Sequence, residues 1–467
     1  MGIVDGTIAP ACNAGTLFYV QTQQTLTQVV EQVTPTLGIE GALAILVGLT
    51  ASAVWINEKI FHLPSAIASM LAGLAFAMGT LLLDRFGFQY SDMTARFISQ
   101  YPFDKIVLNG VLPFLLFATA MQIDLRVLKR SSLQVIYLAT IGILVFAAIE
   151  SGMAYLILWA LPGNLDTTSI TWPATLLFAS LIAPTDAAAV MSVLRRSNAP
   201  KRLRTIIAGE SLFNDATSIV LFTAILAYVS GQDKPASGAI AIGLFTEIGG
   251  GFLIGAVIGG IGALLIRFSK EPSTQVMVML AVVLGGTQIS LIAGASAPLA
   301  VVIAGIIIAR YRITAADDIQ HPTNAVWSVL DQILNGILFF LLGMELLAIK
   351  EWNTYVLLGG VLCFPAIIVA RYLSLFIPWT IFNRGIPNRE LIILSWCGIR
   401  GGVSIALALQ IPVSIAGGSI RDAFVLGAFI TVVLSMLIQG ISAPKIVEKL
   451  SRNMENEKDN SEPRPTT

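Results

Sequence analysis

The chain has 467 residues, of which 55% are apolar and only 12% are charged. Its 28 basic residues balance its 28 acidic residues, so the net charge gives no sign of a nucleic-acid or acidic partner. A mean hydropathy of +0.80 excludes an ordinary soluble domain and predicts an all-α polytopic membrane protein.

Three regions follow one another along the chain. Residues 1–40 form a predicted leader that is partly interfacial, because residues 17–36 alternate Gln and Thr with Leu and Val and are too polar to span a membrane. Residues 41–445 form the predicted transmembrane domain. Residues 446–467 are charged, contain Pro463 and Pro465 and have little to bury, so we expect a disordered cytoplasmic tail.

The transmembrane domain contains thirteen apolar segments that are long enough, or nearly so, to cross a hydrocarbon core. They run over 41–56, 64–83, 107–123, 133–160, 172–194, 205–230, 239–266, 276–293, 297–309, 325–349, 354–378, 390–411 and 420–442. With the N-terminus outside, 20 of the 28 Lys and Arg residues fall on the cytoplasmic side. This asymmetry predicts an external N-terminus and a cytoplasmic C-terminus.

Two of these segments are interrupted at matching places. Segment 172–194 contains Ala183-Pro184-Thr185-Asp186, and segment 390–411 contains Gly398-Ile399-Arg400-Gly401-Gly402. Each is the fifth helix of a six-helix unit, which predicts two inverted six-helix repeats with helices 5 and 12 crossing near the midplane. Free backbone groups at such breaks must be buried in protein or line an aqueous cavity, so we expect the binding site at the crossing. Simple kinks in two helices are the alternative.

Acidic side chains lie in and beside these segments. A charge near the bilayer centre costs at least about 2.5 to 3.5 kcal/mol, so Asp186, Glu210 and Asp215 indicate an ion site. Ser211 and Asp215 are four residues apart and share one helix face, while Glu210 and Asn214 share the adjacent stripe.

The chemistry of these residues fits a small monovalent cation. The carboxylate of Asp215, the hydroxyl of Ser211, and the hydroxyl and freed carbonyl of Thr185 are hard oxygen ligands suited to Na⁺ or Li⁺. The same carboxylate can hold a proton when the cation leaves, because desolvation of a buried site favours the neutral form. Competition for one site then predicts exchange of a cation for a proton.

Other charges inside the membrane have structural interpretations. We expect Glu210 to form a neutral buried pair with Arg400 that holds helices together. Arg371 is predicted to pair with one of the intramembrane acids, which the sequence does not identify. Glu150, Asp331, Glu345 and Glu390 are interpreted as boundary, network or cavity-rim residues.

At these residues the chain resembles the monovalent cation/proton antiporters, and among them the NhaP-type Na⁺/H⁺ antiporters related to sodium/hydrogen exchangers. The motifs are residues 209–215 (GESLFND), the break at 184–186 and residues 398–403 (GIRGGV). The resemblance implies that Asp215 carries the cation and the proton, and that Ser211, Thr185 and Asp186 coordinate the ion directly or through water. It also implies a stabilising Glu210–Arg400 pair and a homodimer in the plasma or inner membrane. An Asn rather than a second Asp at position 214 resembles the electroneutral branch of the family, which implies one proton exchanged per sodium.

The chain departs from many relatives in its third segment. Pro113-Phe114-Leu115-Leu116-Phe117 is followed by residues 118–122 (ATAMQ), where relatives carry an acid. Thr119 or Gln122 is then the candidate neutral ligand from this helix.

Our functional prediction is an electroneutral Na⁺(Li⁺)/H⁺ antiporter with alternating access, embedded in membrane lipid, with no cofactor and no nucleic-acid partner. Exchange of K⁺ for H⁺ is a variant of it. A membrane-embedded hydrolase using Ser211 is an alternative that lacks a base for the serine within the membrane. A passive cation channel is a third, and it needs no carboxylate that binds protons.

Overall fold

A computed structural model describes residues 39–86, 103–161, 171–194, 199–230, 237–315, 322–349, 353–381, 388–412, 415 and 419–461. Helices dominate this part of the chain, as predicted. Their bounds are α2 (Ile39–Ile56), α3 (Ser65–Asp84), α5 (Phe103–Lys105), α6 (Leu112–Gln122), α7 (Leu125–Arg130), α8 (Ser132–Tyr137), α9 (Ile143–Ala160), α10 (Trp172–Ile182), α11 (Ala187–Leu194), α12 (Lys201–Val229), α13 (Ser237–Phe268), α14 (Pro272–Ile292), α15 (Ala297–Ala315), α16 (Pro322–Met344), α17 (Thr354–Ile381), α18 (Asn388–Trp396), α19 (Gly402–Leu409), α20 (Ser419–Leu434) and α21 (Gly440–Ser461).

Short π-helical turns make several of these helices continuous. They are η2 (Asn57–Phe61) after α2, η3 (Ile106–Val111) between α5 and α6, η4 (Leu138–Gly142) between α8 and α9, and η7 (Ser435–Gln439) between α20 and α21. A 3₁₀ turn, η5 (Glu345–Ala348), follows α16. Among the described residues, ten helical stretches are long and apolar enough to cross a membrane, and Trp172–Ile182 and Ala297–Tyr311 are shorter apolar helices. Each of the thirteen predicted segments lies on a helix or a broken pair of helices, whereas the number of crossings stays a prediction.

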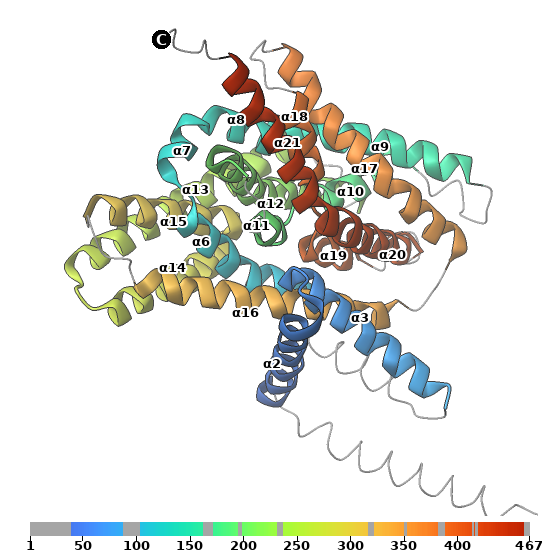
Figure 1. Ribbon diagram of the computed structural model, residues 1–467, viewed down its shortest axis with the longest axis horizontal. Helices are drawn as coiled ribbons and strands as arrows, with labels where there is room; N and C mark the ends of the chain where they lie inside the picture. Colours follow the sequence, from blue (N-terminus) through green and yellow to red (C-terminus); the bar gives the residue numbers. More distant parts are fainter. Residues whose placement is uncertain are drawn as a thin grey trace, which may run out of the picture.

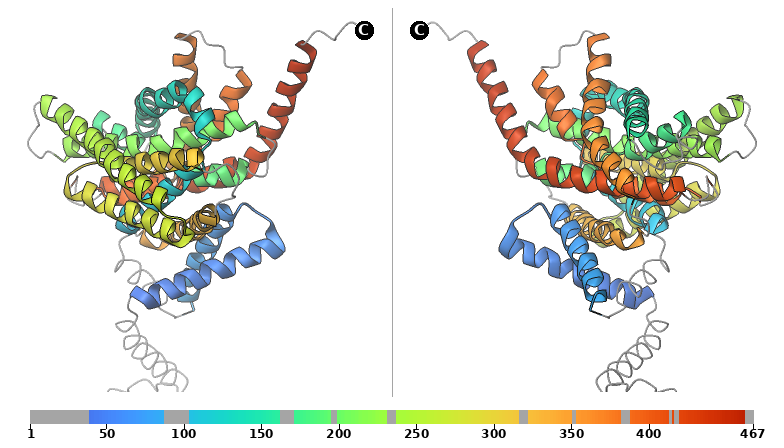
Figure 2. Two further views of the ribbon diagram at one scale, coloured as in Figure 1. Left: turned by 90° about the vertical axis from the view of Figure 1, so that its left-hand side faces the viewer. Right: turned by 90° about the vertical axis from the view of Figure 1, so that its right-hand side faces the viewer.

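Helix α12 lies in the middle of the molecule, with the broken pairs α10–α11 and α18–α19 beside it (Figure 1). Helices α13, α14 and α15 pack together on one side, and α17, α20 and α21 lie on the other (Figure 1). Helices α2 and α3 form an outer layer, in which α3 packs along α16 (Figure 2). This arrangement buries the α12 segment that carries Glu210 and Asp215 from every side.

Helices α13 and α15 approach closely because small residues face one another every four positions. A Cβ atom on Gly259 would lie 2.6 Å from the Cα of Ala304, and one on Gly251 would lie 2.7 Å from the Ser296 carbonyl oxygen. Small residues at helix interfaces allow such contact between backbones in a membrane. No charged side chain takes part in these two contacts, which are purely packing contacts.

The two breaks touch each other, as the sequence predicts. Helix α10 ends at Ile182 and α11 begins at Ala187, while α18 ends at Trp396 and α19 begins at Gly402. The backbone N–H of Asp186 donates to the carbonyl of Ile399 across the two breaks, with N and O 2.8 Å apart. A Cβ atom on Gly401 would lie 2.7 Å from the Cβ of Asp186, so glycine permits the contact. The inverted-repeat relationship stays a prediction.

The tail differs from the prediction. We expected disorder from residue 446, but α21 continues to Ser461. The start of the predicted tail packs on the protein along one side of α21. Val447 and Ser451, four residues apart, are both buried, and Leu450 packs on the core. The rest of the predicted tail, residues 462–467, and all but the last two residues of the predicted leader lie outside the described residues.

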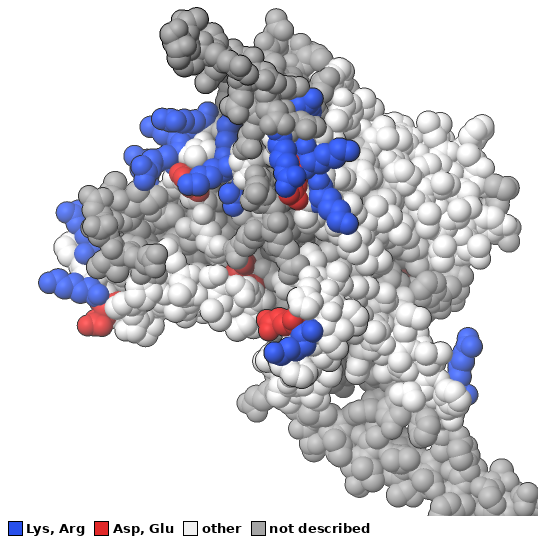
Figure 3. Space-filling view, viewed as in Figure 1, with Lys and Arg blue, Asp and Glu red and all other residues white. Residues whose placement is uncertain are grey.

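Exposed basic side chains gather over one part of the molecule, at the upper left of Figure 3, while the right-hand side shows a broad uncharged surface. The exposed basic residues of the described chain include Arg126, Lys129 and Arg130 of α7 and Lys201 and Arg202 at the start of α12. A charged face beside a large apolar surface is expected of a protein that is partly in lipid and partly in water.

Candidate functional site

The freed backbone groups at the breaks have polar partners. Arg400 Nη1 donates to the carbonyl oxygens of Ala183 (2.6 Å) and Pro184 (3.2 Å), and Asn214 Nδ2 also donates to Ala183 O (3.3 Å). The backbone N–H of Arg400 donates to Ser435 Oγ at 3.0 Å. Buried backbone groups need hydrogen-bond partners, and these contacts therefore allow the ends of both broken helices to be buried away from water.

Asp186 caps the helix that follows its break. Its Oδ1 accepts a hydrogen bond from the backbone N–H of Ala189 at 2.9 Å, so Asp186 is the N-cap residue of α11. The carboxylate therefore lies at the positive end of a half-helix, where the helix dipole favours a negative charge. Asp186 is half-buried.

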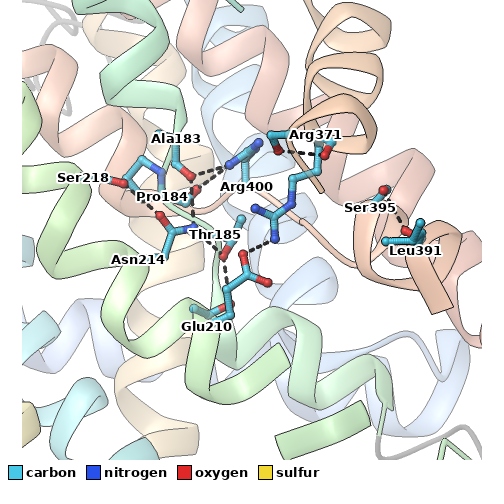
Figure 4. A network of polar contacts seen from close by, with 12 residues as sticks. Ala183, Pro184, Thr185, Glu210, Asn214, Ser218, Arg371, Leu391, Ser395 and Arg400 are labelled. Carbon is cyan, nitrogen blue, oxygen red and sulfur yellow. Dashed lines mark hydrogen bonds and ion pairs between the residues drawn. The ribbon is translucent and has the colours of Figure 1, made fainter. Parts of the chain in front are cut away.

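Hydroxyl and amide groups connect α12 to the first break (Figure 4). The Oγ1 of Thr185 is 2.9 Å from the Oγ of Ser211, and it accepts a hydrogen bond from Asn214 Nδ2 at 3.1 Å. Ser218 Oγ in turn donates to Asn214 Oδ1 at 3.0 Å. The hydrogen bonds with Ser211 and Asn214 thus fix the position of the Thr185 hydroxyl.

Asp215 is the unpaired acid of the site. It is 5% exposed, and within the described part of the chain its Oδ1 is buried without a hydrogen-bond partner. It lines a cavity of about 30 Å³, which is large enough for a water molecule. The other lining residues are Leu112, Leu115, Leu116, Thr119, Pro184, Thr185, Asp186, Ala187, Leu338, Gly401 and Val403. The arrangement can hold one small cation or proton against a carboxylate.

A larger cavity of about 470 Å³ adjoins the small one, because Thr119 and Ala187 line both. Its lining includes the exposed side chains of Glu58 and Lys201, so it opens to the surface. The two candidate ligands on α6 are therefore separated: Thr119 lies at the junction of the cavities, whereas Gln122 lines only the larger one.

The predicted pairing of Glu210 with Arg400 is wrong. Glu210 forms a buried ion pair with Arg371 of α17, and both side chains are almost completely inaccessible. Arg400 points instead to the carbonyls of the first break (Figure 4), with its Cζ 4.6 Å from the centroid of the Phe146 ring. The sequence places two arginines inside the membrane but does not specify which helix faces Glu210, and α17 does.

The roles of two residues of the site could not be predicted from the sequence. Arg371 was an intramembrane arginine without an identified partner, and that unbalanced charge was the available signal. Phe146 had no signal, because an aromatic residue in an apolar segment is indistinguishable from lipid-facing or core residues until the neighbouring helix is known.

A helical membrane protein in which two broken helices cross beside a buried carboxylate has the architecture of a secondary transporter. The family comparison gives the particular class. The model of the family described as "Sodium/hydrogen exchanger, transmembrane" matches residues 41–449. The chain belongs to this family, and it is therefore a transporter and not an enzyme.

Individual relatives agree with this assignment. The chain is similar to the Na⁺/H⁺ antiporter NhaP of Pseudomonas aeruginosa, with 33% identity over 87% of this chain and 96% of the relative. It is also similar to the Na⁺/H⁺ antiporter NhaH of Halobacillus dabanensis, with 26% identity over 87% of this chain and 97% of the relative. The solved structure of the sodium proton antiporter MjNhaP1 from Methanocaldococcus jannaschii has the same fold, with a TM-score of 0.68, 24% identity, and coverage of 88% and 98% of the two chains.

Proposed function

We propose that this protein exchanges Na⁺ or Li⁺ for H⁺ without net charge movement, with the cation and the proton competing for Asp215. The observation that supports this best is the free, buried Oδ1 of Asp215 beside a cavity of about 30 Å³. A carboxylate oxygen that has no partner among the described residues is available to a transported ion.

The ligand set follows from the contacts around that cavity. Asp215 and Thr185 line it and are proposed as direct ligands, and Asp186 acts directly or through a water molecule. Ser211 and Asn214 hydrogen-bond to Thr185 and keep its oxygen in place. Thr119 is the neutral group that the third segment presents to the same cavity.

The charge balance of the site supports electroneutral exchange. Asp215 is neutralised by one proton or by one monovalent cation, so both loaded forms have the same charge. Asn214 adds no second carboxylate, and Glu210 is already neutralised by Arg371. One cation for one proton then completes each cycle.

Alternating access in a defined orientation completes the proposal. We infer that the basic face around α7 is cytoplasmic, that the N-terminus lies outside, and that the cavity of about 470 Å³ opens to the cytoplasm. The conformation is then inward-facing. We also propose a transmembrane antiporter domain at 41–445 between a leader and a cytoplasmic tail. The protein is further proposed to form a homodimer in the cell membrane, and cross-linking in intact cells tests for this dimer.

The decisive experiment uses purified protein in sealed proteoliposomes that contain a pH-sensitive dye. An outward or inward Na⁺ gradient should drive proton movement in the opposite sense, and clamping the membrane potential with K⁺ and valinomycin should not change its rate. A Li⁺ gradient should drive the same exchange as a Na⁺ gradient. The K⁺/H⁺ variant is measured with K⁺ gradients, and the membrane potential is then clamped with a lipophilic ion that carries no protons. A rate that follows the potential would reject electroneutral exchange, and cation movement without proton movement would indicate a channel.

A further inference from the structure

A second buried acid, Glu150 of α9, has no role in the proposed cation site. Its side chain is completely buried, and in the described part of the chain neither carboxylate oxygen has a hydrogen-bond partner. It lines neither of the two cavities described above. Burial of an unpaired carboxylate is costly, so a nearby group of opposite charge is expected to compensate for it.

Arg400 presents a complementary set of free donors. Only its Nη1 binds the carbonyls of Ala183 and Pro184, while its Nε and Nη2 are buried and have no partner among the described residues. The Nε–Nη2 edge of a guanidinium is a planar pair of N–H donors that matches the two oxygens of a carboxylate. One residue thus has two free donors, and the other has two free acceptors.

The positions of the two side chains bring these groups into one neighbourhood. Phe146 and Glu150 are four residues apart, so they lie on the same face of α9. The guanidinium of Arg400 lies over the Phe146 ring, and Phe146 is one helical turn from Glu150. Glu210, another buried acid of the described chain, is already paired with Arg371.

We propose that Glu150 is the counter-ion of Arg400 and that its carboxylate closes onto the free Nε–Nη2 edge as the crossing rearranges during transport. Glu150 is then a positioning residue. It holds Arg400 on the carbonyls of Ala183 and Pro184, which directly precede Thr185. The four buried charges of Glu150, Arg400, Glu210 and Arg371 sum to zero, so the site beside them has no excess positive charge.

The proposal predicts a specific change in kinetics when the charge of Glu150 is removed. Glu150→Gln leaves one uncompensated positive charge near the cation site, and we expect the KM for Na⁺ to rise by about three- to tenfold from repulsion in a poorly screened interior. The rate at saturating Na⁺, normalised to folded protein, should stay within about twofold of the wild-type rate, because Asp215 and its ligands are intact. Glu150→Asp keeps the charge and should keep the KM close to the wild-type value.

The experiment measures Na⁺-dependent proton flux in proteoliposomes for the wild type, Glu150→Gln, Glu150→Asp and a control, Glu247→Gln. Glu247 is another acid within the membrane segments, on α13, and its backbone rather than its side chain bonds Ser296. An increased KM in Glu150→Gln alone supports the proposal. An unchanged KM in folded Glu150→Gln overturns it, and so does an equal increase in Glu247→Gln. Wild-type flux in the same vesicles separates these results from a failure of exchange itself.

A further variant covers the case in which Glu150→Gln does not fold. The double variant Glu150→Gln/Arg400→Gln leaves neither charge unpaired, and its folded yield in size-exclusion chromatography should exceed that of either single variant. A double variant that is no better than the worse single variant would show that the two residues do not form a pair, and it would overturn the proposal.

Discussion

Two acids on the same helix, Glu210 and Asp215, lie five residues apart and have opposite surroundings. Glu210 is bound to Arg371, whereas one oxygen of Asp215, beside a small cavity, has no hydrogen-bond partner in the part of the chain that the structure describes. A cation or proton arriving at Glu210 would have to displace a guanidinium, but at Asp215 it meets an unpaired carboxylate. The comparison shows that the helices packed around α12 decide which acid binds a transported ion and which one stabilises the fold.

The largest effect is expected at the unpaired acid. Asp215→Asn removes the charge but keeps the shape of the side chain, so the protein should fold and exchange should fall to the background of empty vesicles. The measurement is Na⁺-driven proton flux, with size-exclusion chromatography as the control for folding. Exchange at even a tenth of the wild-type rate would remove Asp215 as the carrier and would make the contrast with Glu210 meaningless.

The paired acid should instead show its effect in stability. Breaking a buried ion pair costs about 3 to 5 kcal/mol, so Glu210→Gln and Arg371→Gln should each lower folded yield and the apparent Tm in detergent. The double variant Glu210→Gln/Arg371→Gln should lose much less than the sum of the two.

A matched double variant tests whether this partner is specific. In Glu210→Gln/Arg400→Gln, the changes should be close to additive, because these two side chains form no direct pair. If the Arg400 double variant showed the stronger rescue, the pairing in the structure would be contradicted and the pairing predicted from the sequence restored.

A smaller effect should come from the contact between the two breaks. Gly401→Ala places a methyl group 2.7 Å from the Cβ of Asp186, and overpacking of this kind costs about 1 to 3 kcal/mol. Gly402→Ala is the control, because its methyl group would meet only leucine side chains, the nearest atom being Leu338 Cδ1 at 2.9 Å. We expect Gly401→Ala to exchange more slowly than Gly402→Ala, and similar rates would show that this contact does not shape the site.

The smallest effect is expected at an ion pair on the surface. Arg202 and Glu390 are 3.4 Å apart, but the Arg202 side chain is 51% exposed. Such pairs contribute at most about 1 kcal/mol, so Arg202→Gln should leave the apparent Tm within a few degrees and exchange unchanged. A loss as large as that of Arg371→Gln would mean that burial is not what separates the two ion pairs.

Much of the site is readable from local patterns. Proline removes a helical hydrogen bond and glycine disfavours a helix interior, so breaks near Pro184 and at the Gly401-Gly402 pair could be predicted from the chain. Ser211 and Asp215 share a face because four residues make about one helical turn. The structure places Ser211 against Thr185 and places Asp215 beside the cavity, which agrees with that spacing.

Other features could not be read this way. The sequence offered Thr119 and Gln122 as equivalent candidates, and only the packing of α6 against the first break places Thr119 at the cavity of Asp215. The continuation of α21 was missed because its charged composition hides one buried stripe at Val447 and Ser451.

The sequence by itself determined the membrane-spanning character of the chain, the location of the breaks and the acids available for exchange. These depend on composition and on spacing within one helix, where the backbone geometry sets which residues are neighbours. Only the tertiary structure decided that Glu210 pairs with Arg371, that Arg400 binds the carbonyls of the first break, and that Asp215 remains free. The reason is that partners such as Glu210 and Arg371, 161 residues apart in the chain, are chosen by how whole helices pack, and no local pattern encodes that choice.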